Sequence, residues 1–317
     1  MSYMKLGAVL WSQATDWEGF STAARHTDEL GYDSIWTWDH IYAIFGDPHQ
    51  PILEGYTALA GLATGTEDAE LGLLVGANTF RNPGLVAKMM VNIDHMSGGR
   101  AILGLGGAWF EPEHRAFGIE FGTGFGQRLD WMDEALGAIR AVIDGETFTS
   151  EADGDYSFAE LRIDPAPARN RMPIMIGGSG EKKTLRSVAK YADQWNAFGS
   201  PETLRHKDDV LRRHCVDVGR DHTEIERTVG AKVVVRDTES AARERLHELM
   251  EHNRTPLSNI ADDETFWIGT ADEMIERMLA YREVGFHTFL IEMPAPYDRE
   301  TMEKLVEVVK PAVDKGR

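Results

Sequence analysis

The 317-residue chain has a single cysteine, Cys215, so it can form no internal disulfide framework. It also lacks any run of about 18 apolar residues, the length that a membrane-spanning helix needs. The first residues, MSYMKLGAVLWSQ, carry neither the basic start nor the apolar core of a secretory signal peptide. We therefore expect a soluble cytoplasmic protein with no membrane partner.

Basic residues are scarce. The 33 Lys and Arg residues stand against 52 Asp and Glu, which gives a formal net charge of −19 at pH 7. Such a charge repels the phosphate backbone of nucleic acids and anionic lipid surfaces, and the sequence shows no local basic patch that would offset it. We expect a small-molecule substrate and no nucleic-acid partner.

Several common enzyme motifs are missing. The stretch GGSGEKKT at 177–184 has Lys182 where a P-loop needs a glycine. Gly104-Leu105-Gly106 begins a dinucleotide fingerprint, but Trp109 takes the place of the third glycine, where close helix packing requires a small residue. No Gly-x-Ser-x-Gly elbow is present, and Cys215 falls in a predicted helix far from any strand end, so nucleophilic hydrolysis has no support.

A metal site is not predicted either. His247 and His252 stand five residues apart, which turns the second about 140° away from the first, whereas the zinc-binding HExxH helix needs a spacing of four. Another polar cluster could ligate a metal but is more typical of a charged helix start. It comprises Glu111, Glu113, His114 and Arg115.

Short β-rich runs alternate with amphipathic segments along the whole chain. This alternation is typical of a parallel sheet covered by helices, and eight units in a chain of this length fit a closed (β/α)8 barrel, the TIM-barrel fold, better than an open sheet. No Pro- or Ser-rich linker divides residues 1–317, so we predict one domain. The predicted strands are Lys5–Leu10, Ser34–Trp38, Leu71–Ala77, Ala101–Gly106, Ile174–Gly178, Gln194–Ala197, Thr228–Val235 and Thr288–Glu292.

Apolar residues between these runs recur with helical spacing. Two stripes are predicted to face the core: Leu129, Met132, Leu136, Ile139 and Ile143, and Leu85, Met89, Ile93 and Met96. The pieces DELGYDSIW (28–36) and REVGFHTFL (282–290) each place a glycine where a helix must stop before a new strand. Two longer segments, 110–126 and 238–268, follow the fourth and seventh strands, and such loops of a barrel lie at its C-terminal face, where active sites are built.

Polar residues that directly follow strands are the candidates for chemistry. His40 follows the second strand, where a histidine can give or take a proton near neutral pH; the alternative is a structural histidine bonded to Asp39. Asn78 follows the third strand, where small residues let a planar ligand lie against the backbone. The glycines at 177–180 present backbone N–H groups at a helix start, which favours a phosphate. One acid–base candidate, a surface for a planar ligand and a phosphate-binding turn together suggest that a bound cofactor carries out the main chemical step.

Over nearly its full length the chain resembles the bacterial luciferase-like family of flavin- and deazaflavin-dependent oxidoreductases. The matching stretches are GYDSIWTWDH, NTFRNPGLVAKMMVNIDHMSGGRAILGLGGAWFEPEHRAFGI, PIMIGGSGEKKTLRSVAKYADQWN and IGTADEMIERMLAYREVGFHTFLI. The match is closest to the branch that uses coenzyme F420, a deazaflavin that carries hydride at C5, although the family also contains FMN enzymes. The resemblance implies a (β/α)8 barrel with insertions in its C-terminal-face loops, the cofactor ring in its mouth, and a homodimer.

The resemblance also implies roles for individual residues. His40 would move the proton that accompanies hydride, and a non-proline cis peptide at Leu74–Val75 would stand behind the ring. The other implied cofactor contacts are Asp39, Asn78, Gly106, Gly177, Gly178, Ser179 and Gly180. Related deazaflavin-dependent sugar-phosphate dehydrogenases have a catalytic glutamate where this chain has Trp109, so Glu111 is the candidate replacement. The predicted substrate pocket comprises Trp11, Gln13, Trp109, Phe110, Glu111 and Asn196, with packing at the barrel rim as the alternative.

The sequence thus predicts an F420-dependent oxidoreductase that passes hydride between deazaflavin C5 and an organic substrate. One alternative keeps the fold and makes the protein an FMN-dependent monooxygenase. A second alternative is a non-catalytic carrier of the deazaflavin. The identity of the substrate and the direction of hydride transfer are not predicted.

Overall fold

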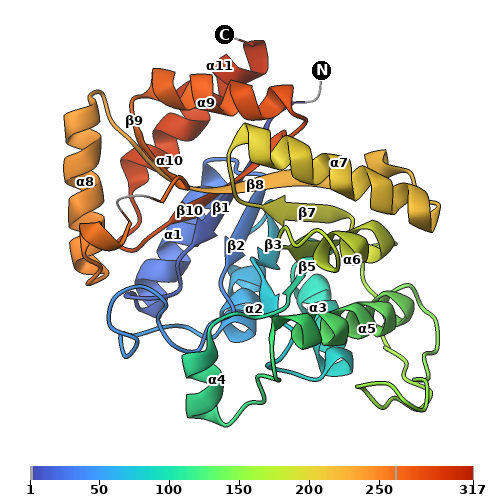
Figure 1. The fold of residues 1–317 in the computed structure, drawn as a ribbon. Coiled ribbons are helices and arrows are strands. Elements are labelled where there is room, and N and C mark those ends of the chain that lie inside the picture. The colour runs from blue at the N-terminus through green and yellow to red at the C-terminus, as the bar shows by residue number, and fades with distance from the viewer. Residues whose placement is uncertain (1–2, 261–262, 317) are drawn as a thin grey trace.

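The computed structural model describes residues 3–260 and 263–316 and shows parallel strands in a closed ring with helices outside it (Figure 1). The strands are β1 (Lys5–Leu10), β2 (Ser34–Thr37), β3 (Glu70–Leu73), β4 (Gly76–Ala77), β5 (Ala101–Gly106), β6 (Ile174–Gly177), β7 (Gln194–Ala197), β8 (Glu226–Val235), β9 (Phe266–Gly269) and β10 (Thr288–Met293). The α-helices are α1 (Trp17–Glu29), α2 (Gly55–Gly65), α3 (Pro83–Met96), α4 (Glu111–Phe117), α5 (Phe125–Ile143), α6 (Thr184–Tyr191), α7 (Pro201–Val218), α8 (Glu239–His252), α9 (Ala271–Glu283), α10 (Arg299–Lys304) and α11 (Lys310–Lys315), with a π-turn at Leu305–Val309 between the last two.

The ring closes through β8. Its residues Thr228–Lys232 pair in parallel with β10, and β10 pairs with β1, so the strand order runs β10-β1-β2-β3-β5-β6-β7-β8 and returns to β10. The end of β8, Lys232–Val235, pairs with the extra strand β9. The prediction of a (β/α)8 barrel is therefore confirmed.

The third predicted strand, Leu71–Ala77, is divided in the structure. It forms β3 and the two-residue β4, which pair with different parts of β5, and the Leu74–Val75 peptide between them is cis, as the resemblance implies. On β5, a Cβ atom at Gly104 would lie 1.9 Å from the carbonyl oxygen of Leu73. Only glycine at this position lets β5 approach the end of β3 so closely.

The helices match one predicted stripe fully and the other in part. The predicted stripe on α5 is buried throughout. The prediction for α3 was right at Ile93, which is buried, and at Met89, which packs against the core. It was wrong at Leu85 and Met96, which are 52% and 46% exposed. The helix carries apolar residues around most of its circumference, and its buried face also holds Val86, Met90 and Val91. Spacing alone could not choose between the two faces.

The two long segments after the fourth and seventh strands are not simple loops. The first contains α4, and the second contains α8, a 3-10 turn at Leu257–Asn259 and β9; Figure 1 shows α4 at the lower edge of the barrel and α8 at its flank. A third long connection, 144–173, was not predicted. It joins α5 to β6 and, apart from one bridge between Phe148 and Leu161, has no regular structure.

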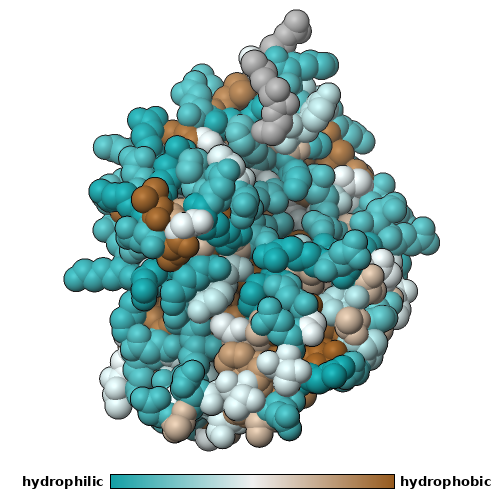
Figure 2. All heavy atoms as spheres, turned by 90° about the vertical axis from the view of Figure 1, so that its right-hand side faces the viewer, coloured by the Kyte–Doolittle hydropathy of each residue, from teal (hydrophilic) through white to brown (hydrophobic). Residues whose placement is uncertain are grey.

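One face of the molecule is seen in Figure 2. The face in Figure 2 is mostly hydrophilic, with small and separate apolar patches. Among the described residues, no helix combines the length and the apolar character needed to cross a membrane.

We predict that Gly104→Ala lowers the free energy of unfolding by about 1–3 kcal/mol or more, because the added methyl group meets the backbone of β3. The matched control is Gly65→Ala at the end of α2, where a Cβ would meet nothing within 4 Å and no loss is expected. Urea denaturation of both variants measures the difference. Equal stabilities would contradict the role assigned to Gly104.

Candidate active site

A cavity of 380 Å³ opens at the barrel mouth, where the C-terminal ends of the parallel strands meet. In barrels of this kind the residues after the strands build the active site. Most of the predicted site residues line it: Asp39, His40, Leu74, Val75, Gly106, Trp109, Gly177, Gly178 and Asn196. Its wall also includes residues that were not predicted to line it, among them Phe45, Glu113, Phe198, Lys232 and Glu292.

The side chain of His40 is oriented by a buried glutamate. Its Nδ1 lies 2.8 Å from Oε1 of Glu113, a side chain that is 1% exposed. Because a carboxylate only accepts, Nδ1 carries the proton and donates it, which leaves Nε2 of this cavity-lining residue as an acceptor. The alternative of a histidine bonded to Asp39 is therefore wrong: the partner of His40 comes from α4.

Glu113 also holds the loop that follows β2. Its Oε2 accepts hydrogen bonds from the backbone N–H groups of Ile41 at 2.8 Å and Tyr42 at 3.2 Å. Three donors thus compensate the burial of this carboxylate. The arrangement fixes the ring of His40 against α4, with Trp109 and Phe110 packed edge-on against the imidazole at centroid distances of 5.7 and 6.1 Å.

Asp39 lines the cavity but its carboxylate is engaged by the protein. Arg81 donates to both oxygens at 2.8 and 3.0 Å, and the Ala77 N–H donates to Oδ2 at 2.9 Å. Burial raises the pKa of the Asp39 carboxyl, and the Arg81 guanidinium and the Ala77 N–H offset part of that rise. Asp39 therefore joins the end of β2 to the segment around β4, which shapes the wall behind the predicted ring position.

The charged cluster at the start of α4 separates into three environments. Glu113 turns inward, whereas Glu111 is exposed and does not line the cavity, so its prediction as a pocket residue was wrong. His114 is fully buried; its Nδ1 donates to the Phe110 carbonyl and its Nε2 accepts from the Thr79 hydroxyl. Burial lowers the pKa of His114, in keeping with this neutral form.

Three other predicted residues lie behind the cavity wall. Trp11 is fully buried, and its Nε1 donates to Glu292 at 2.9 Å. Gln13 is fully buried as well; its amide accepts from the N–H groups of Ile44 and Phe45 and donates to Asn253 Oδ1. Asn78 donates to the Tyr156 hydroxyl at 3.0 Å and faces a neighbouring hollow. The prediction that Trp11 and Gln13 line the substrate pocket was wrong, and both instead support the loop at 41–45. Asn78, predicted as a cofactor contact, does not line this cavity. Phe110 likewise does not line the cavity.

The glycine-rich turn after β6 fits a phosphate group. No acceptor within the described residues meets the backbone N–H groups of 179–183, and Gly178 has a φ of +117°, a conformation that glycine adopts without strain. A Cβ at Gly180 would lie 2.9 Å from the Thr184 hydroxyl, so a larger residue would fill the turn. Unpaired N–H groups in front of a helix are the donor set that anions prefer.

The floor near the cis peptide fits a flat ring. A Cβ at Gly106 would lie 2.6 Å from the Val75 side chain, and one at Gly177 would lie 3.0 Å from it. Because both residues are glycines, the Val75 side chain fits between β5 and β6, and no side chain projects from Gly106 or Gly177 into the cavity. A planar cofactor could lie against this surface with its phosphate on the turn at 177–180.

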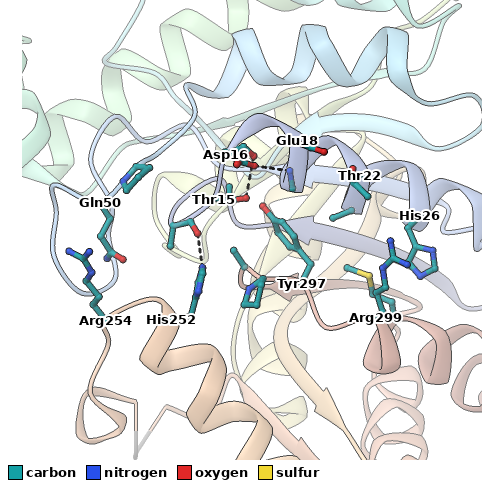
Figure 3. Close-up of a pocket in the computed structure, with 17 residues that line it drawn as sticks. Thr15, Asp16, Glu18, Thr22, His26, Gln50, His252, Arg254, Tyr297 and Arg299 are labelled. Carbon is teal, nitrogen blue, oxygen red and sulfur yellow. Dashed lines mark hydrogen bonds between the residues drawn. The ribbon is translucent and has the colours of Figure 1, made fainter.

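A larger hollow of 710 Å³ lies outside the mouth, between α1, the end of α8 and the segment after β10 (Figure 3). Part of its polar lining is engaged by its neighbours: Asp16 accepts from the Gly19 N–H at 2.8 Å, and His252 Nε2 donates to the Ala14 carbonyl at 2.7 Å. None of the predicted site residues lines it. The smaller cavity is therefore the candidate active site. Within residues 3–260 and 263–316, no group of three or more His, Cys, Asp or Glu side chains is arranged to hold a metal ion.

Residues 4–288 match the luciferase-like monooxygenase family. The chain belongs to this family. It is 24% identical to 4-hydroxyprotoasukamycin monooxygenase of Streptomyces nodosus subsp. asukaensis, over 90% of this chain and 82% of that protein. It is 25% identical to FMNH2-dependent dimethylsulfone monooxygenase of Pseudomonas fluorescens (strain Pf0-1), over 95% and 82%. The structure of an F420-dependent secondary alcohol dehydrogenase with an F420–acetone adduct superposes with a TM-score of 0.84 at 19% identity, over 98% of this chain and 99% of that one.

These similarities confirm the fold and the predicted resemblance. They make this luciferase-like protein an oxidoreductase or monooxygenase that uses a flavin-type cofactor. The named relatives include both FMN and F420 enzymes, so family membership by itself does not choose between the two cofactors.

We predict that Arg81→Met lowers the free energy of unfolding by about 3 kcal/mol, because it leaves the buried Asp39 carboxylate without its cation. The double variant Asp39→Asn/Arg81→Met should recover most of this loss. The matched control is Arg162→Met, which removes the exposed ion pair with Asp164 and should cost less than about 1 kcal/mol.

The decrease in the free energy of unfolding caused by Arg81→Met should also become smaller as the pH falls from about 7 to 5. A carboxyl whose pKa in the folded protein lies above its unfolded value binds protons preferentially in the folded state, so acid stabilises the fold. Without Arg81 the pKa of Asp39 rises further. Urea denaturation at several pH values measures this effect. If Arg81→Met lowers the free energy of unfolding equally at every pH, and Asp39→Asn does not restore it, Arg81 does not compensate the charge of Asp39.

Proposed function

We propose that the protein is a coenzyme F420-dependent oxidoreductase that passes hydride between the deazaflavin and an alcohol or carbonyl carbon of an organic substrate. The observation that carries the proposal is the pair of His40 and Glu113 at the cavity wall, with Nδ1 of the imidazole 2.8 Å from a buried carboxylate. Moving hydride to or from a carbon–oxygen bond requires a proton at the oxygen, and this pair is built to handle one.

The roles of the two residues follow from their contacts. Glu113 holds the Nδ1 proton and so fixes the tautomer and the ring orientation of His40. Nε2 then accepts a proton from a substrate hydroxyl, or donates one to a substrate carbonyl, on the cavity side. The buried carboxylate stabilises the imidazolium that exists while His40 holds both protons. His40 is thus the proposed catalytic acid and base, and Glu113 is its positioning residue.

The turn at Gly177–Gly180 and the wall at Leu74, Val75 and Gly106 are the proposed cofactor contacts. Bound there, a deazaflavin supplies the hydride carrier. Three observations support F420: the resemblance of the matching stretches to the F420 branch, the close superposition with an F420-dependent alcohol dehydrogenase, and the proton-handling pair at the cavity. The phosphate contacts alone do not favour either cofactor, because FMN also bears a phosphate.

A second candidate is an FMN-dependent monooxygenase. It is favoured by the sequence relatives, since dimethylsulfone monooxygenase, which is 25% identical to this chain, is named as FMNH2-dependent. Oxygen consumption distinguishes the two functions, because a deazaflavin reacts poorly with oxygen. A non-catalytic deazaflavin carrier would bind the cofactor without turnover and would be indifferent to substitution of His40.

The deciding experiment is a fluorescence titration of the protein with oxidised F420 and, separately, with FMN near physiological salt. We expect micromolar or tighter binding of F420 and much weaker binding of FMN. The opposite preference would reject the deazaflavin and favour the monooxygenase.

We further predict that Glu113→Gln lowers turnover of reduced F420 with ketone acceptors at least about 100-fold, the lower end of what a positioned acid–base group contributes. The amide keeps the shape but removes the charge that stabilises the imidazolium, so the pH profile of kcat should shift as well. His40→Ala should bind F420 normally and lose most turnover.

The matched control is Glu111→Gln, the same substitution two residues earlier on the same helix. Because Glu111 is exposed and outside the cavity, this variant should match the wild type. A larger effect of Glu111→Gln than of Glu113→Gln would reverse the assignment.

A further inference from the structure

Two charged residues in the cavity have no part in the proposed proton transfer or cofactor binding. Lys232 on β8 and Glu292 on β10 are register partners in the parallel pairing that closes the barrel. Both side chains line the cavity and are 10% and 7% exposed. His40 follows β2, and in the strand order β1 lies between β2 and β10. The pair is therefore not on a strand next to the one that carries His40. Burying an ion pair in a binding cavity costs free energy. A ligand that hydrogen-bonds to the free donors and acceptors of the pair would offset part of that cost.

Lys232 retains unused donors. Its Nζ donates to the Thr265 hydroxyl at 2.9 Å. The carboxylate oxygens nearest to it lie at 3.6 Å on Glu292 and 3.9 Å on Asp263, beyond hydrogen-bonding distance. An ammonium group has three donors, so this one hydrogen bond leaves two of them without a hydrogen-bond acceptor among the described residues.

Glu292 retains an unused acceptor. Its Oε2 accepts from Trp11 Nε1 at 2.9 Å, and no donor among the described residues reaches its Oε1 within hydrogen-bonding distance. This oxygen is the one that lies 3.6 Å from Nζ of Lys232. A free donor and a free acceptor therefore stand side by side at the cavity wall.

The charges around this pair select a neutral ligand. Lys232 lies between the carboxylates of Glu292 and Asp263, so an anionic group that reached the ammonium would also meet two negative charges. A hydroxyl group can both accept from Nζ and donate to Oε1. Two atoms 3.6 Å apart leave room for an oxygen about 2.8 Å from each.

The surroundings of the pair are aromatic. Nζ of Lys232 lies 5.6 Å from the centroid of the Phe198 ring and 5.1 Å from that of Phe266. Phe198 also packs over Gly230 of β8, where a Cβ would lie 2.3 Å from the ring. An apolar body of the ligand would therefore lie against Phe198, with one polar group at the ion pair.

We propose that Lys232 and Glu292 form a subsite that binds a neutral hydroxyl group of the substrate, away from the carbon that reacts beside His40. The substrate class is then an alcohol or ketone with an apolar body and a second hydroxyl group. The position of the reacting carbon beside His40 rests on the proposed function. The subsite does not, because its two residues are placed by β8 and β10.

The test compares the affinities of three probes by ligand-observed NMR: cyclohexanone, 4-hydroxycyclohexanone and 4-oxocyclohexanecarboxylate. Affinities are measured on the full-length protein loaded with F420 and, separately, with FMN. The wild type should bind the hydroxylated probe at least about fivefold more tightly than cyclohexanone, the gain typical of one or two added hydrogen bonds, and should bind the carboxylate most weakly.

Two variants give the subsite a specific signature. Lys232→Met should reduce the preference for the hydroxylated probe to less than about twofold, because it removes the donor. Glu292→Gln should raise the affinity for the carboxylate, because it removes the nearest negative charge. The matched control is Lys304→Met, which removes ion pairs with Asp237 and Glu300 outside the cavity and should leave all three affinities unchanged. Cofactor titration of each variant shows that its fold is intact.

Equal affinities of the wild type for the two neutral probes, no binding of any probe, tightest binding of the carboxylate, or a preference that survives Lys232→Met would each overturn the proposal. The measurement requires no turnover. A lack of F420 turnover would therefore reject the proposed function without deciding the fate of this subsite.

Discussion

The carboxylate of Glu113 is the contact on which the shape of the barrel mouth depends. It is almost fully buried, and it accepts from two backbone N–H groups of the loop after β2 and from His40. One side chain of α4 thereby joins the segments that follow β2 and β5. A buried carboxylate tolerates loss of a donor poorly, so the loop, the helix and the imidazole are held in one mutual arrangement.

The other buried charges at the mouth also have a partner of opposite charge. Asp39 is compensated by Arg81, and Lys232 lies beside Glu292. These pairs stand among aromatic and glycine-rich surfaces, where a low dielectric strengthens each polar contact. The cavity therefore combines an apolar wall with a few fixed polar groups, which is the usual composition of a small-molecule site.

The likeness to both FMN and F420 enzymes has a physical basis in this arrangement. The turn at 177–180 offers backbone N–H groups, which recognise a phosphate whatever ring it carries. The predicted ring wall of Val75, Gly106 and Gly177 carries no charged side chain, so it would not by itself distinguish one tricyclic ring from another. Discrimination between the cofactors, and between substrates, must come from polar side chains at the mouth, which vary independently of the scaffold.

The sequence by itself determined the barrel, because alternating strands and helices and the helix-ending glycines Gly31 and Gly285, with φ of +80° and +93°, are local properties. It also placed His40 and the glycine turn at strand ends. Only the tertiary structure decided which carboxylate serves His40. Glu111 and Glu113 differ by about 200° around α4, so the docking of that helix turns one inward and the other to solvent. Docking likewise chose the buried face of α3, and register across β8 and β10 brought together Lys232 and Glu292, which lie far apart in the chain.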